Sequence, residues 1–242
     1  MAYIILISLG FIPSLAWLFF FLKEDIHPEP KKMIVKVFIA GAVITFIAIF
    51  LQIYFQKAIN FLSLENVHPL PFFLFAFIEE TLKFFAAWLI IAKSKFFDEP
   101  VDAMIYMIVA SLGFALVENV AVAMNIGIIY EAVGAITVRF VGATLLHALG
   151  SGIVGYYWAR AIVVLKKNSN LSKNIEGFII FKGIVIASAI HTVFNYLILV
   201  SGEAIMVYPT IFLAIIALFI FWDFDKIKHT NIQMNANDAN NT

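Results

Sequence analysis

The sequence has no cysteine among its 242 residues, which excludes disulfide bonds, thiolate metal ligands and a cysteine nucleophile. Charge is scarce as well: 13% of the residues are charged, compared with about 25% in an ordinary soluble domain. The formal net charge is zero, so no overall field favours nucleic acid as a partner. Glycine-rich phosphate loops and the GxSxG and HExxH motifs are also absent. These absences exclude several familiar enzyme classes.

Apolar residues are abundant, at 63% of the chain. A soluble core of this size could not bury so much apolar surface, whereas a lipid bilayer can accommodate it. A membrane-spanning helix needs about 20 mostly apolar residues. We therefore predict an all-α fold, a polytopic transmembrane helical bundle. The seven expected spans are 2–22, 34–55, 70–92, 102–125, 134–158, 177–200 and 204–222.

The chain has no segment long enough to form a second, soluble domain. We expect residues 1–228 to form one transmembrane domain and residues 229–242 to form a polar, disordered cytoplasmic tail. The first apolar run lacks the basic region of a secretory signal, so we expect it to stay as a helix. Proline is absent from the interiors of the second to sixth spans, which favours unbroken helices there.

Lysine and arginine gather in alternate connecting segments, which predicts the orientation of the bundle. The alternate segments hold Lys23, Lys31, Lys32, Lys36, Lys93, Lys95, Arg160, Lys166, Lys167, Lys173, Lys226 and Lys228. The remaining segments hold little beyond Lys57. Because cytoplasmic loops carry the excess of Lys and Arg, we expect the N-terminus outside and the C-terminus in the cytoplasm.

The third span contains three charged residues, Glu79, Glu80 and Lys83. Each such charge costs about 2.5–3.5 kcal/mol at mid-membrane on insertion scales. The three must therefore be paired, neutralised or hydrated inside the bundle. Lys83 follows the glutamates by four and three residues, so it can reach either one on the same helix face. The structural alternative is an ion pair that only fixes helix packing.

Three further spans carry polar side chains. The fourth contains Glu118 and Asn119, with Phe114 one turn earlier, and the fifth contains His147. With the orientation above, the glutamates and histidines of the four spans all lie roughly 10–15 Å below the outer face, at about 1.5 Å per residue. Packing contacts alone would have no reason to share one depth. In the sixth span, His191 and Asn195 are spaced i, i+4 and face the same side.

Carboxylates and imidazoles in one layer suit the activation of water. A glutamate can act as general base and then protonate the leaving amine, while His and Asn donors stabilise the oxyanion. Metal ligation is the rival, because Glu80, Glu118, His147 and His191 have the right donor types for zinc. The residues alone leave both chemistries open.

These motifs together resemble the PrsW family of bacterial intramembrane proteases. The resemblance rests on E-E-x-x-K at 79–83, F-x-x-x-E-N at 114–119, the segment of His147 and H-x-x-x-N at 191–195, together with His-Pro-Glu-Pro at 27–30. The pattern is also similar to that of the CAAX-processing and bacteriocin-protection proteases, E-E-x-x-x-R, F-x-x-x-H and H-x-x-x-N. Here Lys83 comes one residue before that arginine, and Glu118 stands where those proteins have histidine.

The resemblance implies an endopeptidase of the bacterial cell membrane that cuts a membrane-anchored, single-span protein of the anti-sigma-factor type near the outer face. The catalytic residues that it implies are Glu79, Glu80, Glu118, His147, His191 and Asn195, with Lys83, Phe114 and Asn119 in support. By resemblance Glu79 is the base. We favour a mechanism without a cofactor, because the Lys83 ammonium competes with a divalent ion for the same carboxylates. Zinc is the alternative.

Two other functions fit the polar layer. A proton- or ion-coupled transporter also uses buried carboxylates and histidines, but no inverted repeat or broken helix is visible in the sequence. A non-catalytic membrane scaffold would need these residues only for packing.

The orientation gives the first testable prediction. Tags at the N-terminus and near Leu64 should be accessible from outside intact cells, whereas tags near Asn168 and after Thr230 should be protected. Labelling before and after permeabilisation measures this. An N-terminus in the cytoplasm would contradict both the orientation and the common depth of the polar residues.

Overall fold

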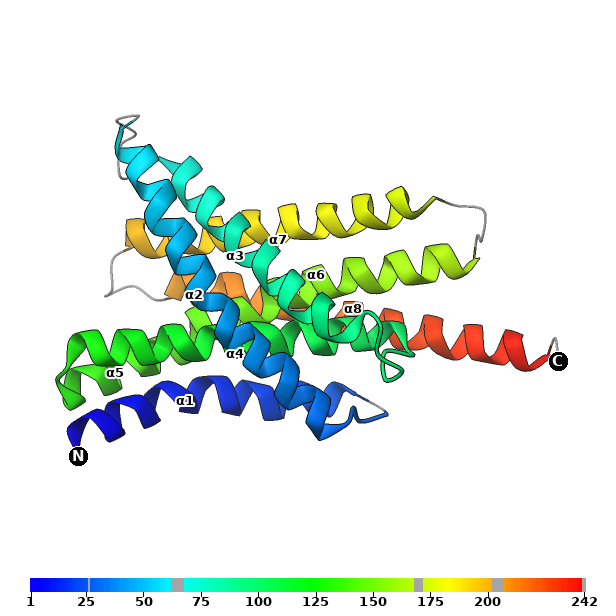
Figure 1. Ribbon diagram of the computed structural model, residues 1–242, viewed down its shortest axis with the longest axis horizontal. Coiled ribbons are helices and arrows are strands. Elements are labelled where there is room, and N and C mark those ends of the chain that lie inside the picture. The colour runs from blue at the N-terminus through cyan, green and yellow to red at the C-terminus, as the bar shows by residue number, and fades with distance from the viewer. Residues whose placement is uncertain (26, 62–67, 168–171, 202–206, 241–242) are drawn as a thin grey trace.

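The computed structural model describes residues 1–25, 27–61, 68–167, 172–201 and 207–240, and within them it contains helices and no strand (Figure 1). The helices are α1 (Ala2–Phe21), the 3-10 turn η1 (Leu22–Glu24), α2 (Lys31–Phe61), α3 (Pro69–Ile91), α4 (Pro100–Ile126), α5 (Ile129–Val141), α6 (Ala143–Lys167), α7 (Lys173–Ser201) and α8 (Val207–Asn240). The predicted all-α class is therefore confirmed. Leu64, Asn168 and residues 204–206, which enter the predictions above, lie outside the described residues.

The bundle has the lengths and composition of a membrane protein. Six segments of the described chain are long and apolar enough to cross a bilayer: Ala2–Glu24, Lys31–Lys57, Pro100–Ile126, Ile129–Lys167, Asn174–Ser201 and Val207–Thr230. The seventh helix of that length is α3, whose 23 residues include the three charged residues described above. The two chain ends lie at opposite ends of the bundle, as an odd number of crossings requires (Figure 1).

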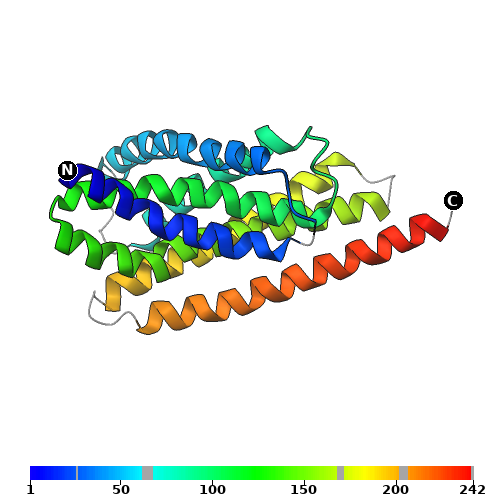
Figure 2. The same cartoon turned by 90° about the horizontal axis from the view of Figure 1, so that it is seen from below.

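The centre of the bundle is α4. Every residue from Pro100 to Leu116 is buried, and the helix packs against α1, α2 and α6. The outer helices expose large apolar side chains, such as Phe50 on α2 and Leu218 on α8, which are 70% and 71% exposed. α8 lies along one side of the bundle (Figure 2). This inverted pattern, with apolar side chains on the outside, suits contact with lipid rather than water.

The expected unbroken span at 134–158 is wrong. Gly142, at φ −104° and ψ −103°, separates α5 from α6. Helical hydrogen bonds continue on both sides, because the Gly142 N–H donates to Val138 (3.0 Å) and the Gly142 carbonyl accepts from Leu146 (2.9 Å). The two helices thus form one interrupted run from Ile129 to Lys167. Glycine is a recognised kink site, so the absence of proline did not guarantee a straight helix.

At its other end the chain is more helical than expected. α8 continues to Asn240, through the part of the tail for which the sequence predicted disorder. The domain boundary at residue 228 stays a prediction.

The crossing of α2 and α4 depends on two glycines. A Cβ added at Gly41 would collide with the carbonyl of Ala110, and one added at Gly113 would collide with the carbonyl of Phe38. The two backbones are therefore in direct contact, which is typical of small residues at helix interfaces in membranes. This contact holds α2, and with it Gln52, close to the core helix.

Replacing Gly113 by leucine should destabilise the bundle, because the new side chain has no room at this crossing. Overpacking typically costs about 1–3 kcal/mol. Thermal unfolding of the purified protein in detergent measures the effect. Gly134→Leu is the matched control, since an added Cβ there meets no atom within 4 Å. Equal unfolding temperatures for the two variants would contradict the close crossing.

Candidate active site

Lys83 lies at the centre of the polar cluster and is fully buried. Its Nζ atom lies 2.8 Å from Glu80 Oε1, 3.4 Å from Glu79 Oε2 and 2.7 Å from His147 Nδ1. It also lies 4.6 Å from the centre of the Phe114 ring. One ammonium therefore joins both glutamates of α3 to a histidine of α6 and an aromatic ring of α4.

The contact with Lys83 sets the tautomer of His147. A charged ammonium only donates hydrogen bonds, so Nδ1 of His147 must accept. The ring proton is then on Nε2, which lies 2.8 Å from Glu118 Oε2 and donates to it. His147 is thus a neutral link between the cation on α3 and the carboxylate on α4.

Glu80 is the most enclosed carboxylate, with no exposed surface. Besides Lys83, it accepts a hydrogen bond from Ser151 Oγ on Oε2 (3.1 Å) and lies 3.4 Å from His191 Nδ1 on Oε1. Gly150 lies beside it, where an added Cβ would be 3.8 Å from the carboxylate. The small residues of α6 therefore make the space that this carboxylate occupies.

Glu79 is held more loosely than its neighbour. Its Oε1 accepts from Gln52 Nε2 of α2 at 2.8 Å. Its Oε2 lies 3.9 Å from Nδ1 of both His147 and His191, beyond hydrogen-bond distance. Adjacent helical residues diverge by about 100°, which explains why Gln52 reaches Glu79 while Ser151 reaches Glu80.

Glu118 belongs to a second hydrogen-bond network, on the side of the His147 ring that faces away from Lys83. Arg139 of α5 donates to Glu118 Oε2 (3.0 Å) and to Asn119 Oδ1 (2.6 Å). Asn119 in turn donates to Thr144 Oγ1 at 3.0 Å. The residues on either side of the break at Gly142 therefore hold the polar residues of α4.

The structure brings together most residues predicted from the sequence: Glu79, Glu80, Lys83, His147, His191, Phe114, Glu118 and Asn119. Asn195 is the exception. It is half-buried one turn beyond His191, and no hydrogen bond joins it to the cluster within the described chain. Sequence reasoning gave no role to Gln52, Ser151, Arg139 or Thr144. Gln52 carried a usable signal, as an amide inside an apolar span.

The donor types and their spacing fit a metal ion. One atom each from Glu79, Glu80, His147 and His191 lies within 4.8 Å of the others, and carboxylates and imidazoles are common zinc ligands. The sequence predicted Glu118 as the fourth possible zinc ligand, whereas in the structure Glu79 is the residue grouped with the other three. The ammonium of Lys83 already contacts three of these four residues. An ion held by all four would have to displace it.

The His-Pro-Glu-Pro segment of the first loop lies elsewhere. Glu29 accepts a hydrogen bond from Tyr106 (2.6 Å), and His27 Nδ1 lies 2.8 Å from Glu99. Tyr106 precedes Glu118 by twelve residues on α4, or about 18 Å along the helix. Burial raises the pKa of Glu29, and that of nearby Asp25, above their ordinary values. This segment ties the first loop to the opposite end of α4 and is not part of the polar cluster.

Comparison with known proteins matches the chain to one family. Residues 29–222 match the model of the PrsW family, described as intramembrane metalloproteases. The protease PrsW of Geobacillus kaustophilus is 28% identical over 199 residues, which cover 80% of each chain. That of Oceanobacillus iheyensis is 31% identical over 168 residues, 69% of this chain and 73% of the relative. No solved structure matches the chain.

The family match covers helices α2 to α7 and the first part of α8, and so includes every residue of the polar cluster. Six segments apolar enough to span a membrane, a buried set of glutamates and histidines, and several related proteases point to the same conclusion. The chain belongs to the PrsW family of intramembrane proteases.

Proposed function

We propose that the chain is an endopeptidase of the bacterial cell membrane that cleaves a single-span membrane protein of the anti-sigma-factor type near the outer face, with water activated by a glutamate. The observation that carries the proposal is the buried contact of Glu79, Glu80, Lys83 and two histidines on three helices. Its position in the outer half of the membrane follows from the predicted orientation.

Glu79 has the better position for the general base. Both oxygens of Glu80 are engaged, by Lys83, His191 and Ser151. Oε2 of Glu79 has only the longer contact with Lys83, at 3.4 Å, and two imidazole nitrogens at 3.9 Å. In the proposed reaction Glu79 takes a proton from water, the oxygen attacks the peptide carbonyl, and the same proton passes to the leaving amine.

The remaining residues position the reacting groups. Lys83 stabilises the charge of Glu80 and keeps the loosely held oxygen of Glu79 directed toward the histidines. Donors on α7, His191 and Asn195, stabilise the oxyanion of the tetrahedral intermediate. Glu118 accepts a hydrogen bond from the Nε2–H of His147 and so fixes the orientation of that ring.

A metal-dependent form of the same protease is the second candidate, favoured by the family description and by the four clustered donors. Glu79, Glu80, His147 and His191 would hold the ion, and a bound zinc would supply a water of lowered pKa. The Lys83 ammonium favours the first mechanism, because it takes up the charge of the carboxylates that the ion would need.

A chelator separates the two mechanisms. Purified protein and a single-span substrate should give cleavage that survives EDTA and 1,10-phenanthroline, with far less than one zinc per chain by elemental analysis. Activity lost to the chelator and restored by zinc, with near-stoichiometric metal, would overturn the glutamic mechanism and establish the metal-dependent one.

Replacing each glutamate singly by glutamine separates the roles of Glu79 and Glu80. Glu79→Gln should reduce turnover by at least about 10²-fold, the scale of general acid–base catalysis, while the unfolding temperature changes little. Glu80→Gln should reduce turnover and, unlike Glu79→Gln, should also lower the unfolding temperature. The reason is that breaking a buried ion pair typically costs about 3–5 kcal/mol.

Glu131→Gln, at an exposed position on α5, is the control and should match the wild type in both measurements. Full activity of Glu79→Gln would contradict its role as the base.

A further inference from the structure

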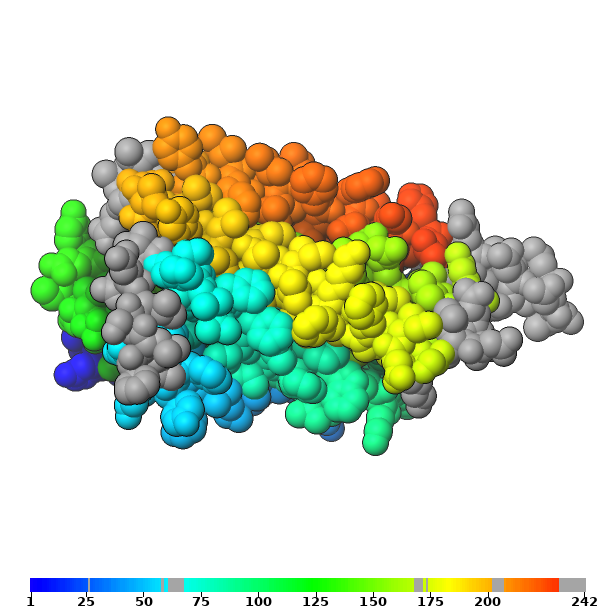
Figure 3. All heavy atoms as spheres, turned by 90° about the horizontal axis from the view of Figure 1, so that it is seen from above, coloured from blue at the N-terminus to red at the C-terminus, as the bar shows by residue number. Residues whose placement is uncertain are grey.

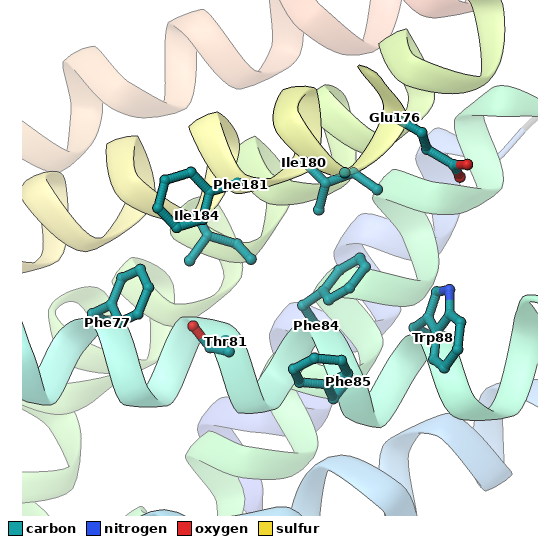
Figure 4. A pocket seen from close by; sticks show the side chains of 10 residues that line it. Phe77, Thr81, Phe84, Phe85, Trp88, Glu176, Ile180, Phe181 and Ile184 are labelled. Carbon is teal, nitrogen blue, oxygen red and sulfur yellow. The ribbon is translucent and has the colours of Figure 1, made fainter. Parts of the chain in front are cut away.

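The seam between α3 and α7 contains an apolar groove that opens at the lipid-facing surface. Figure 3 shows the two helices side by side on this face, and the groove has a volume of about 420 Å³. In Figure 4, Phe84, Phe85 and Trp88 of α3 line one wall, and Ile180, Phe181 and Ile184 of α7 line the other. The volume and the apolar lining of the groove suit the side chains of an apolar helix.

The groove and the polar cluster share their walls. Thr81, which lines the groove, directly follows Glu80, and the two side chains diverge by about 100° around α3. On α7, Ile184 and His191 are seven residues apart, two helical turns, and so lie on the same stripe. A second hollow of about 390 Å³, lined by Phe73 and Thr192 among others, follows the same seam toward the outer end. The two hollows thus follow the seam at the level of the polar cluster: the first beside the charged residues of α3, the second beside His191 of α7.

The hydroxyl of Thr81 has no hydrogen-bond partner. Other buried hydroxyls, such as those of Thr45, Ser188 and Thr192, donate to the carbonyl four residues earlier. Within the described chain, the only unpartnered buried side-chain polar atoms are Thr81 Oγ1 and Ser14 Oγ. The Oγ1 atom of Thr81 is therefore a buried and costly unmet polar group in the wall of the groove.

The cytoplasmic end of the groove is acidic. Glu176, near the start of α7, lines it opposite Trp88 and makes no ion pair with any described residue. Membrane-spanning helices carry Lys and Arg on their cytoplasmic flank. A basic flank would pair with Glu176, whereas the anionic headgroup of a lipid would be repelled. The charge therefore favours a protein helix over a lipid chain.

We propose that this α3/α7 groove is the docking site for the transmembrane helix of the substrate, aligned by a basic cytoplasmic flank at Glu176. The docking site rests on the proposed protease function, and it places the outer part of the bound helix beside Glu79 and His191. The rings of Phe77 and Phe181 meet edge to face at 6.1 Å and bridge the two helices at the groove. In this proposal the two rings separate when the substrate helix enters.

A charge exchange tests the alignment. The substrate is a single-span test protein in detergent, in two versions with three lysines or three glutamates on the cytoplasmic flank. Glu176→Lys should cut the lysine version roughly fivefold more slowly than the wild type does, the upper range for one exposed ion pair. It should cut the glutamate version faster than the wild type does. Glu131→Lys, an exposed change on α5, should leave both rates unchanged.

Crosslinking tests the docking without catalysis. A photoreactive residue at Phe181 of the Glu79→Gln variant should capture the test protein, whereas one at Leu218, on the exposed face of α8, should not. Capture from Leu218 but not Phe181, capture of lipid alone, or cleavage rates that ignore the charge exchange would overturn the docking site. A wild type that cuts neither version would contradict the proposed function instead, and the crosslinking result would still decide the docking.

Discussion

The contact of one ammonium with two carboxylates is the interaction on which the rest of the site depends. Inside an apolar bundle, neither the glutamates of α3 nor Lys83 could remain charged alone, because desolvation of each would cost several kcal/mol. Together their opposite charges offset the cost of burial. The Lys83 ammonium also contacts Nδ1 of His147 and the face of the Phe114 ring. The positions of α4 and α6 relative to α3 thus follow from the needs of one buried cation. A structural ion pair alone would not need the second glutamate.

The sequence predicted the fold class, the order of the spans and most of the polar cluster, because charged residues inside apolar runs are rare and costly. It could not predict how α5 meets α6, since Gly142 gives no sign that distinguishes a kink from a close helix contact. Asn195 was expected beside His191 on spacing alone, and the structure leaves it half-buried and outside the network. Ser151 and Arg139 were visible neighbours of His147, but only the packing of α6 on α3 and of α5 on α4 gives them partners.

Family membership decides between the broad functions that composition left open. A transporter and a protease can both bury carboxylates and histidines at one depth, and the interrupted run at Gly142 removes one argument against the transporter. The match over residues 29–222 to intramembrane proteases decides for the protease. The roles that we propose for the two glutamates rest on local contacts: Glu80 is held by Lys83, Ser151 and His191, whereas Oε2 of Glu79 has the longer contact with Lys83, at 3.4 Å.

The groove between α3 and α7 opens sideways, toward the hydrocarbon, so a substrate that docks there, as we propose, is encountered within the membrane. A helix that enters there diffuses in two dimensions and never leaves the bilayer. Its concentration is then a mole fraction relative to lipid, not a molarity. Adding lipid to a reconstituted sample dilutes such a substrate even when the volume stays fixed, whereas adding buffer leaves the encounter rate unchanged. If substrate helices dock in this groove, as we propose, the ratio of substrate to lipid sets how often enzyme and substrate meet.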